Sequence, residues 1–490
     1  MKEKGNTGSV FASRGLRGKG FTYFICCVSA MGGLLFGYDW VVIGGAELFY
    51  EHYFNIQASS TMQGLAMSTA LIGCLIGAML AGSLSDRYGR KPLLQVAALL
   101  FTLSAIATGA FNDFVMFNIA RFVGGIGIGV ASAMSPMYIA EMSPSYMRGR
   151  LVSLNQMTIV LGILAAQIVN HLLAKPIPDD MAALQTSTDP AQLAQYHEYI
   201  LSSWNGQTGW RWMFWAETLP AGLFLLLVFF IPESPRWQIL NHRMGAAMNT
   251  LAKIGGNRYA QAEAYTIRQT AQTDGRAEKA GLGSLFTKRY AALLLLGIVI
   301  AVFQQWCGTN VIFNYATKIF ADAGYTVSDA LFNIVITGVA NVVFTVVALY
   351  TVDRLGRRVL MLLGAGGLGV IYLILGTCFY FDVKGLFMVV LVVLAIGCYA
   401  MTLGPCTWVL LSELFPNRIR GVAMATCTFA LWMGCSTLTF TFPLMRDSMG
   451  ANGAFWIYSV ICLCGFLFFL RRLPETKGKS LERLEEELAT

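Results

Sequence analysis

The stretch DRYGRK at residues 86–91 decides the fold, because a close copy, DRLGRR, recurs at residues 353–358, which is 267 positions later. Each copy follows a long apolar run. Two more signatures return in the same order: Glu141 with Arg148 and Glu413 with Arg420, and PESPR at 232–236 with PETK at 474–477. Repetition of this kind predicts two related halves of six helices each, with a solute site between them.

The composition places these repeats in a membrane. Of 490 residues, 56% are hydrophobic and 13% are charged, which does not fit the surface of a soluble protein. Apolar runs of about 20 residues recur along nearly the whole chain, and in lipid each run must be a helix. We expect an all-α membrane protein with twelve spans, close to residues 21–49, 62–84, 92–111, 114–140, 151–174, 212–231, 290–320, 327–351, 358–381, 385–412, 421–442 and 453–470.

The net charge of +8 follows membrane topology and does not form a nucleic-acid-binding patch. If the N-terminus is cytoplasmic, 29 of the 35 Lys and Arg residues lie in the tails and connections on that side. Arg121 alone is left within a span. The opposite side holds only Lys175, Arg211, Lys318, Lys384 and Arg446. By the positive-inside rule we expect both termini in the cytoplasm and a multi-pass protein of the plasma membrane, or of the inner membrane in a Gram-negative bacterium.

The pattern of apolar and polar stretches predicts five segments. A cytoplasmic tail covers residues 1–20, the first six-helix bundle 21–234, a polar cytoplasmic linker of short helices 235–289, the second bundle 290–472, and a cytoplasmic tail 473–490. The linker is too hydrophilic for lipid but contains helix-forming pieces such as residues 244–253.

Opposite charges flank matching cytoplasmic helix ends in both halves. A solvated turn would explain such charges in one loop, but it does not explain their repetition. We therefore expect salt bridges that close the cytoplasmic side in one conformation and separate in another. The expected gating residues are Asp86, Arg87, Arg90, Glu141, Arg148, Glu233, Arg236, Asp353, Arg354, Arg357, Glu413 and Arg420.

Two charged residues lie deep within the first half. Asp39 lies in the first span and Arg121 in the fourth, both about 10 to 15 Å below the outer surface at the rise of an α-helix. An unpaired charge at that depth is costly, so the two are expected to pair. The pair is either purely structural or a proton carrier in which protonation of Asp39 releases Arg121, and we favour the proton carrier.

Polar residues cluster in the seventh span, at Gln304, Gln305, Asn310 and Asn314. On one straight helix Gln304 and Asn310 would point about 120° apart. A break near Cys307 would let both face one cavity, where carboxamides can bind a polyhydroxyl ligand. Hydrogen bonding between helices is the alternative reading, and it is common for a single buried amide.

Four further residues are candidates for the same cavity. Gln156 and Asn341 are single amides within the fifth and eighth spans, and either could be merely structural. Trp408 and Trp432 lie well inside their spans rather than at the membrane interface, where Trp is usual. Aromatic faces stack on the C–H faces of pyranose rings, so the pattern favours a sugar.

Taken together, these residues resemble the sugar porter family of the major facilitator superfamily along nearly the whole chain. Within that family the sequence is most similar to bacterial proton-coupled symporters of the D-xylose type, with facilitative glucose carriers more distant. The motifs that carry the resemblance are GGLLFGYD (32–39), DRYGRK, RFVGGIGIG from Arg121, PMYIAEMSP followed by RGR, PESPR, FQQWCGTN (303–310), VDRLGRR, GPCTWVLLSELFPNRIRG (404–421) and PETKGKSLE.

The resemblance implies a role for each matching position. Asp39 would be the proton acceptor and Arg121 its partner, since facilitative carriers typically have Asn in place of this Asp. The resemblance also implies that Trp432 lines the sugar pocket and that Phe36 lies nearby. Sugar contacts are implied at Gln156, Gln304, Gln305, Asn310, Asn341 and Trp408.

The sequence departs from the xylose carriers inside this pocket. Ile163 replaces a Gln and Phe313 replaces a Leu, and both residues match the glucose carriers. Asn314 stands where Tyr is usual, and Leu431 replaces a Gln or Asn before Trp432. The sugar therefore stays open between D-xylose, D-glucose and a similar aldose.

The sequence thus predicts proton-coupled symport of a monosaccharide into the cell by alternating access. We expect a monomer in the lipid bilayer, with no cofactor besides the coupled protons, no metal site and no nucleic-acid partner. The alternatives are an uncoupled facilitative carrier, against which Asp39 argues, and a transporter-like sugar sensor, which would need a long cytoplasmic extension. An enzyme is disfavoured because the spans hold no nucleophile–base pair, so no catalytic residue is expected.

Overall fold

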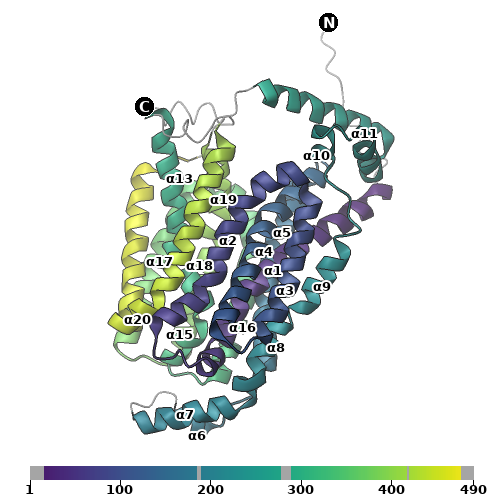
Figure 1. Ribbon diagram of the computed structural model, residues 1–490. Helices are drawn as coiled ribbons and strands as arrows, with labels where there is room; N and C mark the ends of the chain where they lie inside the picture. The colour runs from purple at the N-terminus through teal and green to yellow at the C-terminus, as the bar shows by residue number, and fades with distance from the viewer. Residues whose placement is uncertain (1–15, 185–188, 277–287, 416–418, 476–490) are drawn as a thin grey trace.

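The computed structural model is helical wherever it has regular structure among the residues it describes. Those residues are 16–184, 189–276, 288–415 and 419–475. Most of the helices lie side by side along one long axis (Figure 1). Two helices of the polar linker, α10 (Pro235–Leu240) and α11 (Met244–Arg276), lie at one end, and α6 (Asp179–Leu184) and α7 (Pro190–Ser202) lie at the other. These ends are called the α11 end and the α7 end.

The first half has five long helices and one interrupted span. Side-chain caps start two of the long helices at the α7 end, where Ser59 accepts a hydrogen bond from the Met62 N–H and Asp113 accepts one from the Met116 N–H. The helices are α1 (Leu16–Tyr53), α2 (Ser60–Tyr88), α3 (Arg90–Ala110), α4 (Phe114–Met142), α5 (Arg148–Leu173), the π-helical turn η1 (Asn205–Gly209), α8 (Trp210–Trp215) and α9 (Thr218–Leu227).

The second half repeats this order with more interruptions. Its first span is broken at Gly308, which has φ 87°, a conformation that glycine adopts without strain. The helices are α13 (Lys288–Trp306), α14 (Thr309–Asn314), α15 (Ala316–Asp322), α16 (Val327–Leu355), α17 (Arg357–Tyr380), α18 (Leu386–Met401), α19 (Leu403–Leu414) and α20 (Arg420–Arg472).

Ten helical stretches in the described part of the chain are long and apolar enough to cross a membrane. The predicted twelve spans differ from this number for two local reasons. The last two predicted spans form the single element α20, which is broken at Gly450 with φ 74° and ψ 172°. The predicted span 212–231 is divided between α8 and α9, and neither piece reaches full length. The two bundles therefore keep the predicted twelve-helix plan.

Glycine spacing sets the close packing of α2 against α4. A Cβ atom on Gly125 would overlap the carbonyl oxygen of Ala70, and one on Gly129 would overlap that of Cys74. Gly73 and Gly77 approach the backbone of α4 in the same way. The G-x-x-x-G spacing places these small residues on one face of each helix and so allows the close contact.

The two halves meet along long helices from each side. In this interface α2 packs against α20 and α5 against α16, while α1 contacts both α14 and α15. The contact of α1 is close, because a Cβ atom at Gly44 would lie 2.5 Å from the backbone oxygen of Asn314. Residues of α1 therefore face the broken span of the second half directly.

We predict that Gly125→Ala lowers the melting temperature of the purified protein in detergent, because the added methyl group must push α4 away from α2. Overpacking of this kind costs about 1 to 3 kcal/mol. The matched control is Gly82→Ala on α2, where a Cβ atom meets nothing within 4 Å and the melting temperature should hold or rise. Equal melting temperatures for the two variants would contradict the packing argument.

Candidate functional site

Two matching turns at the α11 end show the sequence repeat in three dimensions. Gly89 has φ 104° and leaves room for the carboxylate of Glu233, which accepts hydrogen bonds from the Arg90 N–H (3.0 Å) and the Lys91 N–H (3.1 Å). Burial raises the pKa of Glu233, while these N–H donors and Arg90 act in the opposite direction.

The second half reproduces this turn. Gly356 has φ 93°, and Glu475 accepts hydrogen bonds from the backbone N–H groups of Arg357 (3.0 Å) and Arg358 (3.1 Å). The PESPR and PETK signatures therefore have one structural purpose, which is to supply the carboxylate that holds the glycine turn between two spans.

Predicted gating charges pair beside these turns. Arg90 forms a two-pronged salt bridge with Glu141, with both hydrogen bonds at 3.0 Å, and lies 3.7 Å from Asp86. In the second half Arg357 donates to Glu413 at 3.0 Å. These bridges join helices of the same half, and their separation in another conformation stays a prediction.

Arg87 and Arg148 lie at the surface of the same end. The guanidinium of Arg87 lies 5.2 Å from the ring centroid of Tyr88, and Arg148 is exposed. The side chains of Asp353 and Arg420 lie outside the described part of the structure.

Asp39 of α1 and Arg121 of α4 form the predicted buried ion pair. The guanidinium donates to the carboxylate of Asp39 and also to its backbone oxygen at 3.4 Å. Asp39 is 3% exposed and Arg121 is 2% exposed, so water screens neither charge. The ring of Phe214 lies 5.6 Å from the guanidinium and closes one side of it.

A second carboxyl group, Glu217, joins this pair and was missed by the sequence analysis. Glu217 is 2% exposed, lies between α8 and α9, and interacts electrostatically with both Asp39 and Arg121. Its Oε1 atom accepts no hydrogen bond from the described residues. The available signal was a single Glu inside the apolar run 212–231, which is costly in lipid unless it has a purpose.

The break at Gly308 brings the predicted amides together. Gln304 and Gln305 lie near the end of α13, and Asn310 lies in the first turn of α14. Asn310 donates to Gln305, Gln305 donates to Gln304 at 2.5 Å, and Gln304 donates to the hydroxyl of Tyr399 at 2.5 Å. This amide chain (Gln304, Gln305, Asn310, Tyr399) gives a row of donors and acceptors, and Tyr399 is its unpredicted member.

An aromatic cluster bridges the two halves. Phe36 lies 6.1 Å and Trp40 5.8 Å from the ring of Trp432, measured between ring centroids. Phe36 and Trp432 were expected near the pocket, whereas Trp40 was not. These rings offer the flat apolar surface that a sugar ring can stack on.

The remaining predicted sugar contacts differ in burial. Ile163, Phe313, Asn314 and Asn341 are buried, Gln156 is partly buried, and Trp408 is 40% exposed. Among the described residues, no hydrogen bond links Gln156, Asn341 or Trp408 to the amide chain. Their roles stay predictions.

Lys318 lies at the α7 end, consistent with the outer side that the charge distribution predicts, but its burial is not predicted. Lys318 is 6% exposed, and its Nζ atom lies 3.0 Å from Glu47 and 2.8 Å from Glu51. This buried cation connects α15 to α1.

The fold and these sites define an integral membrane carrier with two related halves and one polar site between them. The chain belongs to the Sugar (and other) transporter family, whose model matches residues 25–488. It is 36% identical to the D-xylose-proton symporter of Escherichia coli (strain K12), with 95% of each chain covered. It is also 36% identical to the Arabinose-proton symporter of Bacillus subtilis (strain 168), again over 95% of each chain.

Solved structures show the same fold. An inward open conformation of the xylose transporter XylE from E. coli superposes with a TM-score of 0.78 at 34% identity, covering 95% of this chain and 99% of that one. The proton:xylose symporter XylE of the major facilitator superfamily bound to 6-bromo-6-deoxy-D-glucose superposes with a TM-score of 0.72, covering 96% of this chain and 100% of that one.

We predict that Glu233→Ala and Glu475→Ala destabilise the protein by similar amounts, because each removes a carboxylate that accepts two backbone N–H groups. Hydrogen bonds to charged groups contribute about 1.5 to 3 kcal/mol. Thermal unfolding in detergent measures the effect, with the exposed Glu198→Ala as the control. A large loss for one variant and none for the other would contradict the equivalence of the two turns.

Proposed function

We propose that this protein imports a monosaccharide together with protons by alternating access. The observation that carries the proposal is the buried Asp39–Arg121 pair. Asp39 lies on α1, and this helix contacts the broken span of the second half. Relatives described as D-xylose-proton and Arabinose-proton symporters support it.

The ion pair supplies the proton coupling. Arg121 faces two carboxyl groups, Asp39 and Glu217, and a dry site cannot hold an excess negative charge cheaply. A proton that enters from outside and binds Asp39 removes one charge and frees Arg121 from its tightest partner. The first half can then rock against the second with sugar bound, and the proton leaves on the inner side.

The amide chain and the aromatic cluster supply the sugar site. Hydroxyl groups of a sugar replace the mutual hydrogen bonds of Gln304, Gln305 and Asn310, while the rings of Phe36 and Trp432 cover its apolar face. The substrate class is an aldose such as D-xylose or D-glucose. A Glucose transport protein of Synechocystis is 34% identical over 95% of this chain, which supports keeping D-glucose beside D-xylose as a candidate substrate.

The α11 end faces the cytoplasm in this proposal, and the protein lies in the plasma membrane, or in the inner membrane of a Gram-negative bacterium. The positive-inside distribution of Lys and Arg supports that orientation. The chain acts as a monomeric carrier without enzymatic activity or a cofactor other than the coupled protons.

We predict that Asp39→Asn abolishes sugar accumulation and sugar-driven proton uptake in proteoliposomes while sugar exchange across the membrane continues. The neutral Asn cannot carry a proton, yet it keeps the shape that the pocket needs. Proton uptake is followed with a pH-sensitive dye, and exchange with labelled sugar. Unchanged sugar-driven proton uptake in this variant would exclude Asp39 as the carrier, and loss of both activities would leave only a structural role.

We predict that Gln305→Leu weakens sugar binding at least about tenfold, because it removes the central link of the amide chain and leaves its neighbours unpaired. Binding is measured by competition of unlabelled D-xylose, D-glucose and other aldoses against labelled glucose, a panel that also identifies the sugar. The control is Gln261→Leu, an exposed Gln on α11. Unaltered binding by Gln305→Leu would place the sugar elsewhere.

A further inference from the structure

A second group of buried charges lies at the α7 end, about two turns of α1 beyond Asp39. Lys318 on α15 lies 3.0 Å from Glu47 and 2.8 Å from Glu51, and it also donates to the side-chain oxygen of Gln63 at 2.9 Å. Glu47, Glu51 and Gln63 belong to the first half and Lys318 to the second. We call these four residues the outer charge cluster.

The outer charge cluster is dry. Glu47 is 0% exposed, Glu51 is 3% and Lys318 is 6% exposed. The ammonium group of Lys318 donates hydrogen bonds to Glu51 and Gln63. It also lies 3.0 Å from Glu47, but neither oxygen of Glu47 accepts a hydrogen bond from a described residue. Glu47 is therefore the least stabilised member as a carboxylate.

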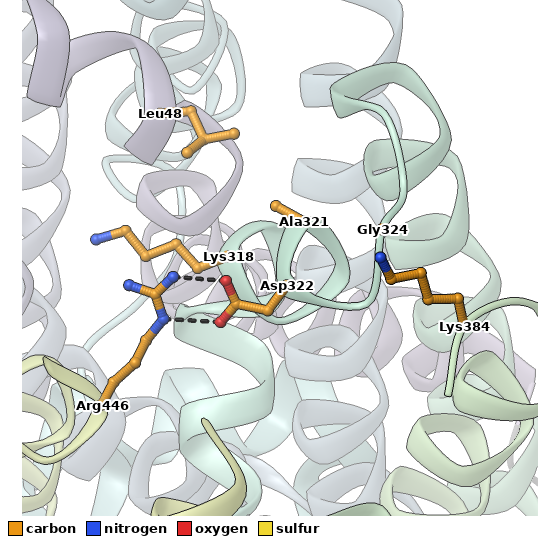
Figure 2. Close-up of a pocket in the computed structure, with 7 residues that line it drawn as sticks. All are labelled: Leu48, Lys318, Ala321, Asp322, Gly324, Lys384 and Arg446. Carbon is orange, nitrogen blue, oxygen red and sulfur yellow. Dashed lines mark hydrogen bonds and ion pairs between the residues drawn. The ribbon is translucent and has the colours of Figure 1, made fainter. Parts of the chain in front are cut away.

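The charges in the outer charge cluster do not balance. Two carboxylates face one ammonium group, which leaves one negative charge in excess if every group is ionised. The other titratable groups that face Glu47 do not cancel that excess. Tyr50 and Tyr315 are neutral phenols, and Arg446 from α20 already holds Asp322 through two hydrogen bonds of 2.6 and 2.8 Å (Figure 2).

We propose that the outer charge cluster is a second proton-binding site, separate from Asp39, that holds one proton while the α7 end is closed and releases it when that end opens. In the closed state a proton shared by Glu47 and Glu51 leaves a neutral group around Lys318. In the open state water surrounds all three charges. The excess negative charge is then no longer costly, and the proton is released.

The outer charge cluster lies between the two halves, so its contacts must break when the α7 end opens. Lys318 must leave Glu47 and Glu51 if the two halves separate at the α7 end, and Thr317 must release the backbone oxygen of Gly44, which it binds at 2.6 Å. A cavity of about 410 Å³ borders the cluster at Lys318, and Leu48, Asp322, Lys384 and Arg446 also line it (Figure 2).

The inference rests on the proposed alternating access, because it requires an α7 end that opens. Its consequence is that opening depends on external pH even without the coupling proton. Each rise of one pH unit favours the open state by at most about tenfold, which is the limit for release of one proton.

The test is hydrogen–deuterium exchange of the full-length protein in detergent without sugar, followed in peptides covering α15 between pH 6 and 8. All proteins carry Asp39→Asn, and uptake is corrected for the intrinsic pH dependence of exchange. In this parent, opening should increase with pH. Adding Glu47→Gln should leave opening low and independent of pH, because Glu51 and Lys318 then form a neutral pair.

Three further variants make the result decisive. Glu51→Gln should behave like Glu47→Gln, and it replaces that variant if Glu47→Gln does not fold. Lys318→Met leaves two carboxylates without a cation, so opening should be greater and steeper with pH. Glu198→Gln, which changes an exposed Glu on α7, should keep the pH dependence of the parent.

The contrary outcomes separate this inference from the proposed function. The pH dependence could persist in Glu47→Gln and Glu51→Gln, or opening could increase in these two variants at all pH values. Either result means that the cluster is a static ion pair and overturns the second proton-binding site. Loss of the pH dependence in Glu198→Gln as well means that it does not come from the outer charge cluster, and this also overturns the proposal. An α15 that never opens in the parent contradicts alternating access itself.

Discussion

A charge that leaves water inside an apolar helix bundle must meet an opposite charge, and this constraint organises the molecule. Helix α1 carries three buried acids, and the bundle brings one cation to each of two levels along it. At the deeper level Arg121 pairs with Asp39 and interacts electrostatically with the buried Glu217, and at the α7 end Lys318 pairs with Glu47 and Glu51. Each level holds one carboxyl group more than it has cations. Excess acid in a dry site is most cheaply neutralised by a proton, so α1 is suited to respond to protons along its length.

Some features of the structure are repeated in both halves, and others occur in only one. The turns at the α11 end are built alike in both halves, with a positive-φ glycine and a carboxylate that accepts two backbone N–H groups. Apart from these matching turns, the two halves differ. The first half places its buried acids on an unbroken helix, whereas the second breaks the corresponding span at Gly308 and gathers amides there. The repeated turns can support a symmetric rocking motion of the two halves. The features that differ between the halves are the proposed sites for the proton and the sugar.

The sequence predicted the features that depend on local pattern. Hydropathy located the spans, and the cluster of amides indicated a break close to the observed one at Gly308. Features that depend on how helices rotate against one another were missed. Tyr399, Trp40 and Glu217 each come from a different helix or connection, and nothing near them in the sequence marks their partners. The burial of Lys318 was missed because its position near the end of a predicted span gives no information on whether a neighbouring helix covers it.

The short helices α14 and α15 connect the sugar site to the α7 end. Asn310, in the amide chain, lies in the first turn of α14, and Lys318 lies eight positions later in α15, a separation of about 12 Å along a helix. Between them, Asn314 and Thr317 contact the backbone of α1 at Gly44, which lies between Asp39 and Glu47. In the proposed mechanism, a sugar bound at Asn310 acts on the segment that also carries Lys318 to its two acids. The constraint on buried charge would then make movement of this segment sensitive to protons at both levels of α1.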